Sequence, residues 1–96
     1  MSHRNVFLAK YGSTKHVDDG LNSDKPYIRM AAASNHLATK SHINKALDDD
    51  AWEVRERAIR NRNANENHVG KALKDNRWPV REAAVKHPDI TSQHIS

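Results

Sequence analysis

The chain contains IRMAAASNHLATKSHINKALDDDAWE over residues 28–53, followed directly by VRERAIRNRNANENHVGKALKDNRWP over residues 54–79. An offset of 26 residues places similar residue types over one another, and VREAAVKHPDITSQHIS over residues 80–96 continues the register. Ile28 aligns with Val54 and Val80 in this way. Internal repeats of roughly 20–50 residues are typical of solenoids and arrays, in which each unit buries its apolar face against its neighbours.

The repeat predicts the domain organisation. A chain of 96 residues leaves no room for the two-lobed architecture that most enzymes use. We expect a single domain over residues 1–96, with copies at about 2–27, 28–53, 54–79 and 80–96. The first copy is decayed and the last is truncated.

Residue types that cap helices recur twice in each copy. One column holds Ser13, Thr39, Asn65 and Thr91, and the other holds Asp24, Asp50 and Asn76. Each type can accept a hydrogen bond from an N–H group in the first turn of a helix, and Asp50 with Glu53 has the spacing of a capping box. Each copy should therefore begin two helices.

These columns fix the helices that we expect. The first helix of each copy is predicted at about residues 3–10, 25–34, 51–61 and 77–87, and the second at about 14–22, 40–48 and 66–74. Asn35, Asn61 and His87 are predicted to end the first helix in the left-handed conformation. The predicted fold class is all-α, a right-handed α-solenoid of about 3.5 repeats with two short helices in each.

The run AVKHPDIT occupies residues 84–91, and ALDDDAWEVRERAI and ALKDNRWPVREAAV occupy residues 46–59 and 72–85. They resemble the variant leucine-rich repeat and related HEAT-like helical repeats, in which a Val-Arg pair opens one helix and an Asn/His-Pro-x-x-Thr turn leads to the next. The resemblance covers nearly the whole chain and implies a scaffold for partner binding. The turn proline occurs only at Pro88, and the cysteine-rich segment of some variant leucine-rich repeats is absent, so no iron–sulfur role carries over. Short proteins of this kind resemble accessory proteins of phages and bacteria, which implies a regulator of a host or partner protein.

Composition excludes several classes of site. The chain has no cysteine, which excludes disulfides, thiolate zinc sites and iron–sulfur clusters. It has no Gly-rich phosphate loop, and its serines fall mainly in caps and turns rather than beside an activating base. We expect no enzymatic activity, no cofactor and no metal. The first twenty residues lack a long apolar run, which predicts no signal peptide, no membrane span and a cytoplasmic location.

Two polar columns invite a ligand-binding interpretation, but their spacing favours structural roles. His16, His42, His68 and His94 lie one repeat apart. Neighbouring helices pack roughly 8–10 Å apart, whereas a zinc ion holds its ligands within about 2.1 Å. Arg29, Arg55 and Arg81 form the second column. They lie beside apolar positions of the first helix, so we expect their guanidinium groups to bond carbonyls or a carboxylate of an adjacent turn.

Nucleic acid is the alternative partner. The net charge of +4 permits it without deciding the matter. The candidate phosphate-binding residues are Arg57, Arg60, Arg62 and Lys86. Glu53, Glu56 and Glu82 each precede one of these residues by four positions, which is also the arrangement of a solvated, ion-paired helix.

A contrast between copies predicts a protein-binding patch. Where the third copy carries charged residues at outward positions, the second carries apolar or small ones, and the column continues into the first copy. The predicted patch consists of Leu8, Tyr27, Met30, Ala31 and Ser34. The alternative is that the N-terminal segment folds across these residues as a cap. The leading hypothesis is a non-enzymatic module that binds another protein.

The end of the sequence predicts a second contact. The last copy stops in the first turn of its second helix, so the apolar face of its first helix, with Val80, Ala84 and Val85, lacks a covering helix. Solenoid ends need a polar cap to stay soluble. We expect this end to be covered either by a second copy related by a two-fold axis or by the protein partner.

Overall fold

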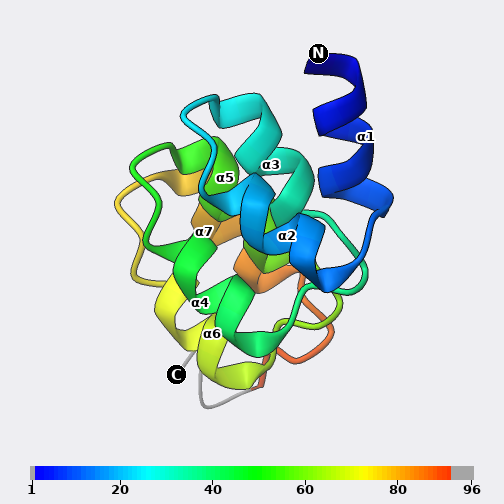
Figure 1. The fold of residues 1–96 in the computed structure, drawn as a ribbon. Helices are drawn as coiled ribbons and strands as arrows, with labels where there is room; N and C mark the ends of the chain where they lie inside the picture. Colours follow the sequence, from blue (N-terminus) through cyan, green and yellow to red (C-terminus); the bar gives the residue numbers. More distant parts are fainter. Residues whose placement is uncertain (1, 92–96) are drawn as a thin grey trace.

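The computed structural model describes residues 2–91, and within this range it contains seven α-helices and no strand (Figure 1). The helices are α1 Ser2–Tyr11, α2 Thr14–Leu21, α3 Pro26–Ala33, α4 Lys40–Leu47, α5 Trp52–Arg60, α6 Glu66–Ala72 and α7 Trp78–Val85. All seven were expected from the sequence, and each helix begins and ends within two residues of the expected position. None of these helices is long and apolar enough to cross a membrane.

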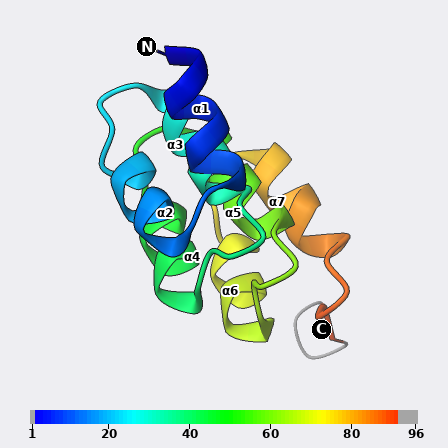
Figure 2. The same ribbon diagram turned by 45° about the vertical axis from the view of Figure 1, so that its right-hand side comes forward.

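The helices lie in two layers. Helices α1, α3, α5 and α7 pack side by side in chain order, and α2, α4 and α6 form the second layer (Figures 1 and 2). Each helix of the second layer contacts the first-layer helices before and after it in the chain. The molecule is elongated, with extents of 46 × 22 × 17 Å.

Small and β-branched side chains fill the space between the layers. The largest fully buried side chains are Ile43, Ile59, Val17, Val54, Val69, Val80 and Asn35. Alanines occupy most of the other core positions, among them Ala32 and Ala58. Such short side chains let neighbouring helices approach closely, and a helix of seven to ten residues depends on this burial because it is marginal on its own.

The predicted caps of the second-layer helices are confirmed at Ser13, Thr39 and Asn65. The histidine three residues after each cap completes a capping box, in which its Nδ1 accepts a hydrogen bond from the backbone N–H of the cap residue. The fourth residue of this column, Thr91, is the last described residue, and His94 lies outside the described residues.

The predicted caps of the first-layer helices are wrong by one residue. Lys25, Ala51 and Arg77 stand at the cap positions of α3, α5 and α7 and make no side-chain cap bond, so Asp24, Asp50 and Asn76 are not caps. The carboxylates that bond the backbone there are Asp49, which accepts from Ala51 N–H at 2.9 Å, and Asp75, which accepts from Arg77 N–H at 2.9 Å. The expected capping box of Asp50 and Glu53 is therefore not formed.

The predicted left-handed ends of the first-layer helices are also wrong. No residue of the described chain has a positive φ angle. Asn35, Asn61 and His87 instead end these helices with side-chain bonds to the preceding helix, from Asn35 Nδ2 to the Ala9 carbonyl at 2.9 Å and from Asn61 Nδ2 to the Asn35 carbonyl at 2.9 Å. In the same role, His87 Nε2 lies 3.3 Å from the Asn61 carbonyl. These side-chain bonds end the first-layer helices, and the backbone turns without a residue in the left-handed conformation.

Candidate protein interface

The arginine column is built into the fold, as the sequence predicted. Arg29 donates from Nε and Nη2 to both carboxylate oxygens of Asp49, at 2.8 and 3.2 Å, and Arg55 does the same to Asp75, at 2.8 and 3.1 Å. Nη1 of each arginine reaches a backbone carbonyl, of Ser23 and Asp49 respectively. Bidentate pairs of this kind are strong and directional. These two arginines are therefore engaged inside the protein and are not free to bind phosphate.

The Arg55–Asp75 pair shifts the pKa of both partners. The hydrogen bond to Asp75 raises the pKa of Arg55. Burial alone would raise the pKa of Asp75, but the hydrogen bonds from Arg55 and from the Arg77 N–H outweigh it, so the pKa of Asp75 is lowered. Both groups are held in their charged forms.

Arg81 differs from the other two arginines of the column. Its Nη1 donates to the Asp75 carbonyl at 2.7 Å, but no described residue offers a carboxylate to its Nε and Nη2. The side chain is exposed. One side of its guanidinium thus faces solvent.

The histidine column has a structural role, which confirms the prediction for the three histidines that the structure describes. Nδ1 of His16, His42 and His68 lies 2.9–3.0 Å from the backbone nitrogen of its cap residue. His42 also pairs with Asp18 on α2. Burial lowers the pKa of His68, and the nearby Lys71 adds to this effect. Among the side chains that the structure describes, those of residues 4–91, no three of His, Asp or Glu come together in a way that could hold a metal ion.

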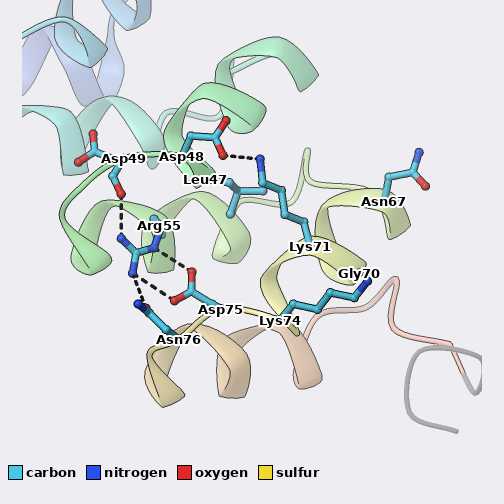
Figure 3. A pocket seen from close by; sticks show the side chains of 10 residues that line it. All are labelled: Leu47, Asp48, Asp49, Arg55, Asn67, Gly70, Lys71, Lys74, Asp75 and Asn76. Atoms are coloured by element: carbon cyan, nitrogen blue, oxygen red, sulfur yellow. Dashed lines mark hydrogen bonds and ion pairs between the residues drawn. The ribbon is translucent and has the colours of Figure 1, made fainter.

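An open groove lies between the ends of α4 and α6 (Figure 3). It has an open volume of about 830 Å³ and is lined by Leu47, Asp48, Asp49, Arg55, Asn67, Gly70, Lys71, Lys74, Asp75 and Asn76. Its charges are largely paired with one another, since Lys71 binds Asp48 and Arg55 binds Asp75 (Figure 3). Because Arg55 and Lys71 are already paired with carboxylates, two of the three cations that line the groove are not available to an anionic ligand.

The predicted protein-binding patch is only partly exposed. Ala31 is buried at 5% exposure, and Met30 packs against the core. Leu8 and Ser34 are half-buried, and Tyr27 alone is exposed, at 46%. The prediction that Ala31 faces outward is wrong, because this residue lies in the interior of the helix packing, where α3 contacts α1, α2 and α5.

The predicted nucleic-acid residues are partly engaged. Arg60 pairs with Glu56 at 3.1 Å and Lys86 approaches Glu82 at 3.9 Å, as the four-residue spacing predicted. The third expected pair, of Glu53 with Arg57, is not formed, and Arg57 is half-buried. Arg62 is exposed on the connection between α5 and α6.

An exposed apolar cluster that the sequence analysis missed lies where α1 ends. Phe7 and Tyr11 are 61% and 59% exposed, their ring centroids are 5.2 Å apart, and the Lys10 ammonium lies 5.5 Å from the Tyr11 ring. Leu37 is 43% exposed. It lies close by, because its N–H bonds the Asn35 side chain, which in turn bonds the carbonyls of residues 9 and 12. We call Phe7, Lys10, Tyr11 and Leu37 the N-terminal edge.

The repeat itself hid this cluster. Phe7 stands in the column of Ala33 and Ile59, both of which are buried, so periodicity predicts an interior residue. A signal was nevertheless present in the charges. Residues 1–17 contain no Asp or Glu, and neither do residues 25–47. An aromatic pair in an acid-free, basic segment is typical of a surface that meets a partner.

No protein-family model, no curated protein and no solved structure matches this chain.

Proposed function

We propose that this protein is a short α-solenoid that acts as a non-enzymatic module for binding another protein, and that the partner contacts the N-terminal edge. The observation that carries the proposal is the exposed Phe7–Tyr11 ring pair, together with exposed Leu37 on a turn that Asn35 bonds to the end of α1. Aromatic side chains are enriched at protein interfaces, and a few such residues contribute most of the binding energy.

The solenoid interpretation rests on bonds that recur at the repeat interval. The side chains of Asn35, Asn61 and His87 each bond the backbone 26 residues earlier. Arg29 and Arg55 each bond the aspartate 20 residues later. The same inter-helix contact made again at a fixed interval is what holds a solenoid together, because each unit contacts only its neighbours.

The chemistry of the edge indicates the chemistry of the partner. Lys10, His36 and Arg62 lie at equivalent positions of successive repeats, and all three are exposed. Residues 1–17 contain no Asp or Glu that could neutralise these positive charges. We therefore expect a partner surface that combines apolar side chains with carboxylates, since complementary charge steers association and fixes register.

Nucleic acid is the weaker candidate. Basic residues with aromatic side chains can also bind single-stranded nucleic acid. Of the four residues that would contact phosphate, however, Arg60 and Lys86 already face carboxylates. Exposed Leu37 also offers no ring for a base to stack on. These features favour a protein partner.

Site-directed crosslinking tests the proposal. A photo-crosslinking phenylalanine analogue at Tyr11 is expected to form an adduct with a discrete protein in cells, and the same analogue at Asn44, exposed on α4, is expected to form none. The adduct at position 11 should be lost when Phe7→Ser is added, while the melting temperature stays the same, because Phe7 is mostly exposed. Crosslinks to nucleic acid that vanish at high salt would overturn the proposal in favour of the second candidate.

A further inference from the structure

Four side chains on α7 form a single exposed strip. Trp78 and Val85 are 64% and 51% exposed, and Arg81 and Glu82 between them are exposed as well. Their spacing of three, four and seven residues places them on one face of the helix. We call these four residues the α7 strip. Val80, Ala83 and Ala84 lie on the opposite face and are buried.

The equivalent strip on α5 is covered. Ile59, which corresponds to Val85, is fully buried, and the Trp52 ring lies under the Arg77 guanidinium at 6.0 Å. Arg55, which corresponds to Arg81, binds the Asp75 carboxylate. The strip on α5 is therefore covered by α7, and its arginine is paired with the Asp75 carboxylate. Among the described residues, none supplies a carboxylate to Arg81 or covers the strip on α7.

The strip is complementary to itself. When two copies of α7 lie antiparallel across a two-fold axis that passes between residues 81 and 82, Trp78 faces Val85 of the second copy. The same axis places Arg81 of each copy opposite Glu82 of the other, which gives two symmetric ion pairs. The acidic group needed by the open side of the Arg81 guanidinium is thus present on the strip itself, because the contact of Glu82 with Lys86 is long, at 3.9 Å, and exposed, so it leaves the carboxylate accessible. We propose that the α7 strip is the interface of a homodimer, with these two kinds of contact.

The size of this end of the molecule limits the affinity. The protein is only 22 × 17 Å across its shorter extents. A stable interface covers about 800 Å² on each partner, so a face of this size supports a weak dimer. We expect the dimer to form at high protein concentration and to dissociate on dilution.

Charge exchange tests the pairing. Sedimentation equilibrium between about 10 µM and 1 mM should show a concentration-dependent dimer for the unmodified chain. Arg81→Glu and Glu82→Arg should each abolish it, because either one places like charges opposite each other. The double variant Arg81→Glu/Glu82→Arg should restore it, since the opposite charges then face each other again. Arg4→Glu, which reverses an exposed charge on α1, is the matched control and should still dimerise.

Tryptophan fluorescence gives an independent readout. In the Trp52→Phe variant only Trp78 emits, and its emission should shift to shorter wavelength as the concentration rises, because the ring leaves water. Trp78→Ser should prevent dimerisation without lowering the melting temperature, since the side chain is exposed. The proposal is overturned by a monomer at every concentration. It is equally overturned by a dimer that survives both single charge reversals, because that dimer would use another surface.

Discussion

The side-chain amide of Asn61 donates a hydrogen bond to the backbone carbonyl of Asn35, its own counterpart 26 residues earlier, at 2.9 Å. Asn61 Nδ2 also bonds the Ala33 carbonyl at 2.9 Å, and its Oδ1 accepts from the Asn63 N–H at 2.9 Å. One buried side chain therefore ends α5, shapes the following turn and fastens α5 to α3. The column of Asn35, Asn61 and His87 links the first-layer helices one after another.

Replacement of Asn61 by Ala should destabilise the protein by about 1–3 kcal/mol, because the buried Ala33 carbonyl would lose its side-chain partner and the Asn35 carbonyl would keep the bond from the Ala38 N–H alone. Urea denaturation followed by circular dichroism measures this loss. Asn44→Ala, at an exposed position of α4, is the control and should change the free energy of unfolding by less than about 0.5 kcal/mol. Equal effects of the two substitutions would show that the column carries no special stability.

Arg55→Lys should cost about 1–3 kcal/mol, since one ammonium group cannot reproduce the two directed bonds to Asp75 and the bond to the Asp49 carbonyl. Arg81→Lys in dilute solution is the matched substitution in the same column. It should have a much smaller effect because Arg81 has no carboxylate partner among the described residues. A thermal melt of the two variants compares them directly, and an equal loss would contradict the structural role of the carboxylate.

The capping histidine of α6 should make stability depend on pH. Because the folded state lowers the pKa of His68 from its ordinary value of 6.5, the unfolded chain binds more protons than the folded one just below that value. The contribution of His68 is thus fully present above about pH 6.5 and is lost as the pH falls through the range below it. The difference in unfolding free energy between the unmodified protein and His68→Gln, measured from pH 8 to about pH 5, should shrink towards acid. A difference that grew towards acid would mean that the folded state favours the charged imidazole.

Ala31→Glu tests the correction to the predicted patch. Ala31 is 5% exposed on α3, so a carboxylate there would be buried without a partner and should lower the melting temperature strongly. Leu37→Glu places the same charge at a 43% exposed position and should leave the melting temperature nearly unchanged. A differential scan of the two variants separates a residue of the interior from one on the surface.

The sequence by itself determined the repeat and most of its local structure. The 26-residue register predicted seven helices in the right order, because the position of a short helix follows from the spacing of its apolar residues and its caps. Ser13, Thr39 and Asn65 were predicted as caps because such a side chain bonds its own helix, within three residues. The structural role of Arg55 was foreseen from its apolar neighbours on the helix.

Only the tertiary structure decided which residues are covered. Phe7, Ile59 and Val85 occupy one column, yet Ile59 is fully buried and the other two are mostly exposed. Periodicity describes one repeat, whereas burial depends on whether a neighbouring helix lies against that face, and this differs from one position in the stack to the next. The ends of the first-layer helices were misjudged for a related reason. Asn61 ends α5 through bonds to α3, and a contact between residues 26 positions apart has no local signature in the sequence.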